Sequence, residues 1–359
     1  MSVSSLFEPL SLRHGKPMPN RLMLAPLTNR QSRPDGAPTD DDEHWLKLLG
    51  EGGYGLIHTC AATVLAGGRT FIGQLGIHCD DFLPGLTRLA KAAGAHGALT
   101  SVQLHHGGYR VDPELGGIPL PASNGLVSGI GAISVEQIAS VRDSFVKAAV
   151  RAAEAGFDGV ELHGAFGFVL SQFLSPLLNT RNDQYGGDLE NRARIVFETI
   201  NAVRTALGAD FQLGIRLSVD RHGLKVEEIR DVVGEIMRQQ QVDYIDLALW
   251  DSAQRIGQGS KEGRKMLELF TSLPRHGVRL GTAGKIMSAS RASELLEEGC
   301  DFVLIGRAAC IHPDIPRRIA ANPHYVVPSL PVSEQFLQAQ GLSTPLIDYL
   351  KTWPDFVKN

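Results

Sequence analysis

Residues 160–194 read VELHGAFGFVLSQFLSPLLNTRNDQYGGDLENRAR, and the rest of the chain is organised around this stretch. It begins as an apolar strand that ends at His163, continues through a long loop rich in Phe, Leu, Pro and Asn, and enters a helix near Asp188. A buried strand that stops on a His and a Gly carries the imidazole to the rim of a core, where it can meet a ligand. The alternative is a His that only caps the end of its own strand.

The same alternation of strand and helix extends to both sides of this stretch. Ser134 and Gln137 form a capping-box pattern that starts one of the helices, and Gly156 ends it. Apolar runs predict strands at 21–25, 54–60, 98–104, 157–163, 211–218, 242–249, 278–282 and 301–305. Helical spacing predicts helices at 42–49, 82–95, 134–155, 188–207, 226–239, 261–273 and 288–298.

Eight apolar strands that alternate with amphipathic helices predict a parallel sheet closed on itself, because continuous apolar runs indicate burial on both faces. The expected fold is an α/β (β/α)8 TIM barrel in a single domain, 1–359, with a tail from about residue 325. An open doubly wound sheet is the alternative, but it would start with a Gly-rich turn where this chain has Pro26, Leu27 and Thr28. The segment 107–131 is rich in Gly, Pro and Ser and is expected to cover the barrel mouth.

Composition narrows the class of partner. The net charge is -4 and the pI is about 6.3, so no basic face for nucleic acid or an anionic membrane is predicted. Four scattered cysteines form no metal-binding spacing and indicate reduced thiols in a cytoplasmic protein without a metal site. No apolar stretch reaches the roughly 18 residues of a membrane span. A small-molecule partner is expected, and homo-oligomer formation stays open.

Active sites of such barrels lie at the C-terminal ends of the strands. After the last two strands, Ala283, Gly284 and Gly306 are small enough for backbone N–H groups to approach an anion, and Arg307 can bind it through two N–H groups. These loops predict a phosphate site, although glycines that only form tight turns remain the alternative. The strand ends carry Pro26, Leu27, Thr28, Ala61, Gln103, His105, His106, His163, Arg216, Trp250, Ala283, Gly284, Gly306 and Arg307.

Two motifs resemble a known family. H-G-A-x-G-[FY]-x-L-x-Q-F-L-S-P from His163, followed by N-x-R-x-D-x-Y-G-G-x-L-E-N-R-x-R, is similar to the old yellow enzyme (NADH:flavin oxidoreductase) family. The resemblance implies an FMN barrel reduced by NADH or NADPH, with the FMN phosphate in the loops of Gly284 and Arg307. It also implies Gln103 and Arg216 as donors beside flavin N1 and O2, and Thr28 beside O4, in a site that Pro26, Leu27, Ala61, Ala283 and Gly306 help to form. A buried Gln–Arg pair and a strand-end Thr cap are the alternatives.

The resemblance further implies that His163 donates to the carbonyl oxygen of an activated alkene. The family usually has a His or Asn at the position of Phe166 and a Tyr at that of Phe168. His105, His106 or Tyr109 could supply the missing proton, or could be loop residues without a chemical role. The expected substrate contacts are His163, Phe166, Phe168, His106, Tyr109 and Trp250.

Three functions follow from these residues. The first is an FMN-dependent oxidoreductase that takes hydride from NAD(P)H and reduces an electron-poor alkene such as an α,β-unsaturated carbonyl compound. The second is a flavin-binding barrel with altered or lost ene-reductase activity, which serves a quinone or nitro compound, because Phe166 and Phe168 replace the usual donors. The third is a phosphate-sugar lyase or isomerase, which needs a lysine or carboxylate at a strand end; Lys285 lies one residue beyond Gly284.

Overall fold

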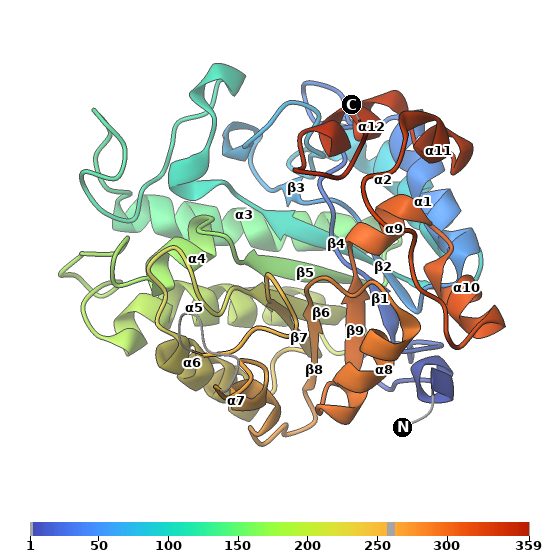
Figure 1. The fold of residues 1–359 in the computed structure, drawn as a ribbon. Coiled ribbons are helices and arrows are strands. Elements are labelled where there is room, and N and C mark those ends of the chain that lie inside the picture. The colour runs from blue at the N-terminus through green and yellow to red at the C-terminus, as the bar shows by residue number, and fades with distance from the viewer. Residues whose placement is uncertain (1–2, 257–262, 359) are drawn as a thin grey trace.

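A computed structural model describes residues 3–256 and 263–358. Its strands are all parallel, and each barrel strand pairs with the next until the last pairs with the first, so the expected closed barrel is confirmed (Figure 1). A short extra strand, β3 (Ala62–Thr63), pairs with the end of β4. The barrel strands are β1 (Leu22–Leu24), β2 (Leu56–His58), β4 (Leu99–His105), β5 (Gly159–Gly164), β6 (Gln212–Leu217), β7 (Tyr244–Ala248), β8 (Arg279–Ala283) and β9 (Phe302–Ile305).

Helices surround the barrel (Figure 1). The capping box of Ser134 and Gln137 is formed as expected. The helices are α1 (Asp40–Gly52), α2 (Leu83–Gly94), α3 (Val135–Glu154), α4 (Val169–Leu174), α5 (Leu189–Leu207), α6 (Val226–Gln239), α7 (Glu268–Thr271), α8 (Ala289–Glu297), α9 (Arg307–Ile311), α10 (Ile315–Ala321), α11 (Glu334–Ala339) and α12 (Thr344–Lys351). Short 3-10 turns are η1 (Val3–Phe7), η2 (Ala66–Gly68), η3 (Asp80–Phe82), η4 (Gly108–Arg110) and η5 (Pro113–Leu115). Within the described ranges, no helix is long and apolar enough to cross a membrane.

The helix expected at 261–273 is wrong over most of its length. Only α7 is helical there, and residues 261 and 262 lie outside the described residues. Met266 donates to the carbonyl of Gln254 and Ile256 donates to that of Arg264, so this part of the segment is held extended against the loop after β7. Tertiary pairing thus overrides the helical spacing of its apolar residues.

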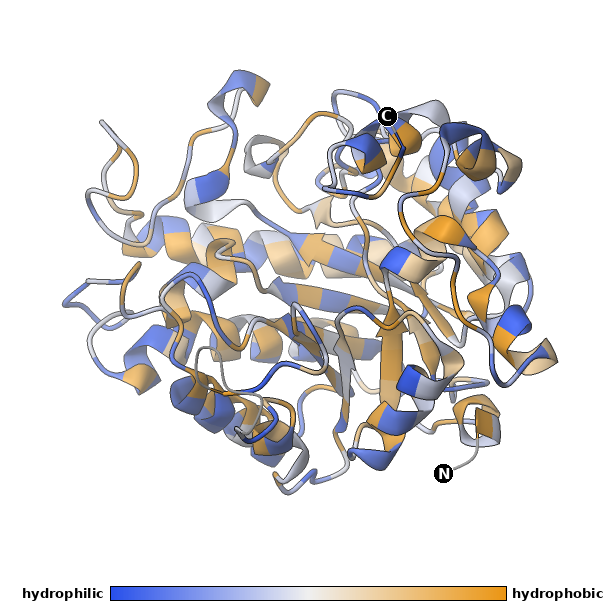
Figure 2. Cartoon of the chain, in the orientation of Figure 1, coloured by the Kyte–Doolittle hydropathy of each residue, from blue (hydrophilic) through white to orange (hydrophobic). Residues whose placement is uncertain are grey.

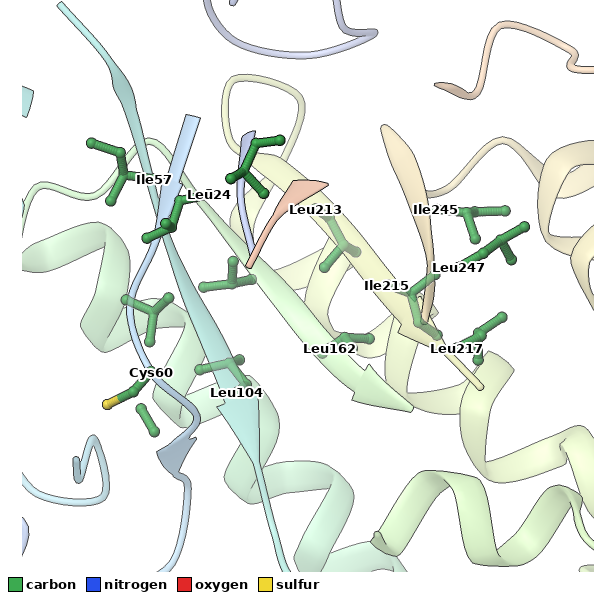
Figure 3. Packing of buried hydrophobic residues seen from close by; sticks show 14 of the residues in the cluster. Leu24, Ile57, Cys60, Leu104, Leu162, Leu213, Ile215, Leu217, Ile245 and Leu247 are labelled. Atoms are coloured by element: carbon green, nitrogen blue, oxygen red, sulfur yellow. The ribbon is translucent and has the colours of Figure 1, made fainter. Parts of the chain in front are cut away.

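Successive strand residues face opposite sides of the barrel wall. One set packs outward beneath the helices, as shown for Leu162, Ile215 and Leu247 in Figure 3, and the hydropathy colouring shows polar faces on the outer helices (Figure 2). The alternate set forms a second, smaller core inside the barrel that includes Tyr244 and Phe302. Further along the strands, this inner set becomes polar: Gln103, His105, Glu161, His163, Arg216 and Asp246.

Glycines make room for the inner aromatic rings. A Cβ on Gly214 would lie 2.1 Å from the Tyr244 ring, and one on Gly281 would lie 2.3 Å from the Phe302 ring. The two rings therefore fill the barrel below the polar residues, which confines any ligand to the mouth.

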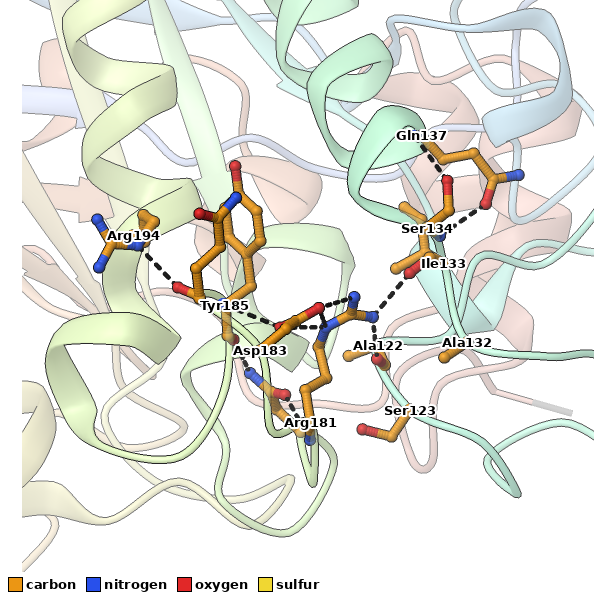
Figure 4. A network of polar contacts seen from close by, with 12 residues as sticks. Ala122, Ser123, Ala132, Ile133, Ser134, Gln137, Arg181, Asp183, Tyr185 and Arg194 are labelled. Carbon is orange, nitrogen blue, oxygen red and sulfur yellow. Dashed lines mark hydrogen bonds and ion pairs between the residues drawn. The ribbon is translucent and has the colours of Figure 1, made fainter.

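The Asn179–Gly187 motif folds into a structural clamp around Arg181 (Figure 4). The Arg181 guanidinium donates to the carbonyls of Ala122 (2.9 Å) and Ile133 (2.7 Å) and pairs with Asp183. It ties the excursion after β4 to the loop before α5. Only the start of that excursion reaches the barrel mouth, through Arg110, so the expected cover is partial.

Candidate active site

The pairing register brings the polar inner residues side by side. His163 pairs with Arg216 across β5 and β6, and Arg216 pairs with Asp246 across β6 and β7. Gln103 likewise pairs with Glu161 across β4 and β5. Parallel strands therefore place an imidazole, a guanidinium and an amide at one end of the barrel.

A buried charge network lies within the barrel and reaches His58. Glu161 accepts a hydrogen bond from Gln103 Nε2 at 2.9 Å and lies 3.3 Å from His58 Nε2. Burial would lower the pKa of His58, but Glu161 outweighs it and raises that pKa. Burial would raise the pKa of Glu161, yet His58 and Arg216 hold it below its usual value. The Glu161 carboxylate is therefore ionised, and it forms a buried pair with His58 that further hydrogen bonds support.

Arg216 has its own buried partner. Its Nε lies 3.1 Å from Asp246 Oδ2, and the Asp246 side chain is fully buried. Burial raises the pKa of Asp246 to about 7 although Arg216 acts in the opposite direction. The guanidinium is thus held from within the barrel while it lines the mouth.

His163 is positioned as a neutral hydrogen-bond donor. Its Nδ1 accepts a hydrogen bond from the Ala165 N–H at 3.4 Å, which leaves the proton on Nε2. Burial holds the pKa of His163 well below its usual value, with further lowering by His105 and Arg216. The imidazole therefore remains neutral near pH 7 and offers Nε2–H rather than a full charge.

The two phenylalanines of the motif flank this imidazole. The ring centroids of Phe166 and Phe168 lie 5.6 Å and 5.0 Å from that of His163. Phe166 adopts a left-handed φ of 57°, and its N–H donates to Ser218 Oγ at 2.9 Å, which holds the turn in place. The imidazole of His163 is thus in contact with two apolar aromatic rings.

Two adjoining cavities open at the barrel mouth and share Pro26, Thr28, Phe166, Arg216, Trp250 and Tyr349. We call them the histidine cavity, about 560 Å³, which contains His163, and the glycine cavity, about 670 Å³, which contains Gly284 and Gly306. Other grooves of similar volume, such as one of about 680 Å³ beside η1 and α8, lie on the outer helices. All expected cofactor residues line the pair: Pro26, Leu27, Thr28, Ala61, Gln103, Arg216, Ala283, Gly284, Gly306 and Arg307.

Two residues expected to contact substrate lie away from these cavities. His106 is buried, and its Nδ1 accepts a hydrogen bond from the Gly108 N–H at 3.0 Å. The Tyr109 hydroxyl lies beside Gly167, and Tyr109 is not among the lining residues of either cavity. His163, Phe166, Phe168 and the half-exposed Trp250 do line the histidine cavity.

His105 lines the histidine cavity in place of His106. Its ring centroid is 5.3 Å from that of His163 and 4.4 Å from that of Phe168, and both of its ring nitrogens are buried without a hydrogen-bond partner. Burial lowers the pKa of His105 to about 3, and burial lowers that of His106 to about 4. Neither imidazole is protonated at neutral pH.

The glycine cavity suits an anion such as a phosphate. In the described part of the chain the Arg307 guanidinium has no carboxylate partner, and it lies between the rings of Trp250 (5.8 Å) and Trp353 (5.7 Å). Gly306 has room around its Cβ position, with no atom nearer than 3.7 Å. Gly284 instead serves packing, because a Cβ there would lie 2.7 Å from the Ser252 nitrogen.

The amide of Gln103 differs from the expectation. Since the ionised Glu161 carboxylate only accepts hydrogen bonds, the Gln103 nitrogen must face it, and the carbonyl oxygen is left for a ligand. This orientation offers an acceptor at the mouth where the sequence suggested only a donor. Arg216 remains as the cationic donor, so the donor and acceptor set fits the polar edge of an isoalloxazine.

Sequence reasoning missed several lining residues: Arg30, Thr70, Phe71, Arg110, His222, Tyr349, Trp353 and Pro354. The aromatic residues Tyr349 and Trp353 come from α12 and the residues after it, and their four-residue spacing was a readable sign of one helical face. Arg110 lies in a loop whose path only the structure shows. Among the described residues, no three His, Cys, Asp or Glu side chains gather as a metal site.

Comparisons with known proteins agree with this geometry. The profile of the NADH:flavin oxidoreductase / NADH oxidase family matches residues 5–324. The chain is 32% identical over 323 residues to a probable NADH-dependent flavin oxidoreductase, YqiG, of Bacillus subtilis (strain 168), covering 86% of each chain. It is 32% identical over 326 residues to an NADPH dehydrogenase of Bacillus pumilus (strain SAFR-032), covering 88% of this chain and 94% of that one. Morphinone reductase superposes with a TM-score of 0.77 at 27% identity, over 93% of this chain and 94% of that one.

Proposed function

Because the chain belongs to the NADH:flavin oxidoreductase / NADH oxidase family, an FMN- and NAD(P)H-using family of oxidoreductases, we propose that it reduces an electron-poor alkene, such as an α,β-unsaturated carbonyl compound. The observation that carries this proposal is the neutral imidazole of His163, whose free Nε2–H lies at the mouth beside Arg216. A neutral N–H donor polarises a carbonyl without first losing a proton.

The glycine cavity would bind the phosphate of the cofactor, and the histidine cavity would bind the substrate. Arg307 would hold the FMN phosphate in the glycine cavity, and Arg216 with Gln103 would contact the polar edge of the ring. FMN held there would supply the chemistry of hydride transfer from NAD(P)H to an alkene. His163 would donate to the carbonyl oxygen, while the rings of Phe166 and Phe168 keep water from that hydrogen bond.

Balance requires one proton at the α-carbon for each hydride at the β-carbon. His105 and His106 are neutral, and Tyr109 lies outside the lining, so we assign this proton to solvent. A rate that depends on solvent deuterium, and that no single variant of His105, His106 or Tyr109 abolishes, is the expected sign.

The experiment measures the two half-reactions separately in a stopped-flow instrument without oxygen. His163→Ala should slow oxidation by 2-cyclohexenone by about two to three powers of ten, the usual loss for one oxyanion donor. Reduction by NAD(P)H should change less. Phe166→Asn restores a second hydrogen-bond donor beside His163 and should increase the rate of enone reduction. If His163→Ala leaves enone reduction intact, this function is overturned.

A quinone or nitro acceptor is the second candidate. It is favoured by one observation, namely that Phe166 and Phe168 leave His163 as the one donor at this turn of the described chain. Such acceptors take electrons without a strongly polarised carbonyl. They would reoxidise the His163→Ala variant as fast as the parent enzyme.

A further inference from the structure

The Lys and Arg side chains in the linings of the histidine cavity and the glycine cavity give the barrel mouth a positive charge. They are Arg30, Arg110, Arg216, Lys285 and Arg307, and among the residues that the structure describes neither lining contains an Asp or a Glu. The chain as a whole has 35 Lys and Arg against 39 Asp and Glu, so this excess of cations belongs to the mouth and not to the composition. A concave site lined by one sign of charge attracts ligands of the other sign.

Most of these cations already have a partner or a proposed one. Arg216 pairs with Asp246, and Lys285 Nζ lies 3.1 Å from Asp251 Oδ2. Arg307 is assigned above to a phosphate. Arg30 also lines the histidine cavity and lies over the rings of Phe71 (5.9 Å) and Tyr349 (5.0 Å). Arg110 lines the same cavity and contacts the turn that carries Phe166 and Phe168.

Arg110 is held in place by the two phenylalanines beside His163. One guanidinium nitrogen donates to the Phe166 carbonyl oxygen at 2.6 Å, and the guanidinium carbon lies 4.8 Å above the Phe168 ring. No ion pair joins Arg110 to a carboxylate in residues 3–256 or 263–358. A guanidinium has five N–H donors, so most of them remain for a ligand.

The positive charge of Arg110 helps to lower the pKa of both His105 and His163. It contributes to lowering the pKa of His163, after burial and the effects of His105 and Arg216. Phe168 contacts both groups, with its ring centroid 5.0 Å from the imidazole centroid and 4.8 Å from the guanidinium carbon. The separation of imidazole and guanidinium therefore cannot exceed the sum of these distances, so one ligand can reach both groups.

We propose that Arg110 binds a carboxylate of the substrate while His163 polarises its carbonyl, so that the preferred substrates are electron-poor alkenes bearing an acid group. The proposal rests on the function proposed above. A planar carboxylate matches the paired N–H groups of a guanidinium, and a fixed guanidinium loses little entropy when it binds. The Phe168 ring thus serves as the platform for a charged donor, which the backbone carbonyl of Phe166 also holds.

The test compares two substrates of nearly equal shape, a cyclic enone with a carboxymethyl side chain and its methyl ester. The parent enzyme should prefer the acid in kcat/KM by about 10- to 100-fold, the size of one charge-assisted contact, and chiefly through KM. In Arg110→Gln this ratio should fall to near one. Arg221→Gln is the matched control, because Arg221 lies 4.6 Å over Trp250 outside either lining and should leave the ratio as it is.

A binding measurement separates this inference from the function on which it rests. The saturated acid, which cannot be reduced, should perturb the flavin absorbance of the oxidised holoenzyme, with a Kd that rises about 10- to 100-fold in Arg110→Gln. If neither enone is reduced but this binding holds, the proposed function fails and the acid site stands. Equal use of acid and ester overturns the acid site. An increase in the Kd of NAD(P)H in Arg110→Gln, with the acid preference kept, also overturns it, because Arg110 would then bind a coenzyme phosphate.

Discussion

Arg216 and Asp246 are register partners on neighbouring strands, and the guanidinium Nε lies 3.1 Å from a carboxylate oxygen that has no access to water. Asp246 thus fixes the direction of a cation that lines the mouth of the barrel. A guanidinium held in this way needs no reorganisation when negative charge appears beside it, which is the property that favours reduction of a bound flavin.

Arg216→Met should lower the midpoint potential of bound FMN, because the reduced ring loses its counter-charge. Loss of one charge-assisted interaction, about 1.5–3 kcal/mol, corresponds to roughly 30–65 mV for a two-electron couple. The measurement is a dye-coupled reductive titration, with Arg221→Gln as a control of equal charge change. A potential that stays within a few millivolts would remove Arg216 from the flavin edge.

Arg307→Ala should weaken FMN binding by about 10- to 100-fold, since one charge-assisted phosphate contact is lost. Titration of the apoprotein with FMN, followed by quenching of flavin fluorescence, gives the Kd. Arg318, which pairs with Asp314 on α10 away from both cavities, provides the control variant Arg318→Ala. An equal loss of affinity in both variants would contradict a specific role for Arg307.

The rate of enone reduction should show no inflection from His163 between about pH 5.5 and 8. Burial keeps the pKa of His163 well below its usual value, so the same neutral form is present throughout this range. The profile of kcat/KM for the parent enzyme and for His163→Asn should therefore have the same shape at different heights. A drop in activity above pH 6.5 that disappears in His163→Asn would mean that a protonated imidazole is the donor.

Asp246 should make the apoprotein less stable as pH rises. Its folded pKa, raised by burial to about 7, exceeds its usual value of 3.8, so the folded state binds the extra proton between these values. Stability is then lost as pH increases through this window, by at most about 1.4 kcal/mol per pH unit. The free energy of unfolding of Asp246→Asn in urea should rise relative to the parent protein between pH 4 and 7 and level off above it. A difference that does not depend on pH would show that Asp246 is ionised throughout.

Arg181→Ala should destabilise the fold by about 2–4 kcal/mol, because buried carbonyls and Asp183 lose a charged partner. Arg142, whose partner Asp143 is mostly exposed, gives the control variant Arg142→Ala, with an expected loss under about 1 kcal/mol. Hydrogen exchange should accelerate most in residues 118–134. Uniform acceleration over the barrel would instead indicate a global effect.

The barrel could be predicted from the sequence because each strand is buried on both faces and therefore forms an uninterrupted apolar run. Every residue that was expected to contact a cofactor stands at the end of one of these runs and lines one of the two cavities. The fold brings the ends of the strands together. The assignment of His106 instead of His105 to the cavity was avoidable. Adjacent strand residues face opposite sides, so an inward Gln103 already required an inward His105.

Other parts of the site could not be predicted from local sequence. Arg110 has no periodic environment, and its position depends on the Phe166 carbonyl and the Phe168 ring, which belong to a different strand end. The partner of Arg216 is set by register between β6 and β7, which a single sequence does not specify. The helix expected at 261–273 failed for a similar reason, because pairing with residues 254–256 outweighs local preference.

The contribution of the C-terminal tail to the mouth has a consequence for biosynthesis. The barrel wall is complete at β9, but Tyr349, Trp353 and Pro354 are needed to enclose the glycine cavity. A chain emerging from the ribosome can therefore close its sheet well before it can retain a cofactor. We therefore expect a flavin to be retained only after the tail has packed against the barrel mouth.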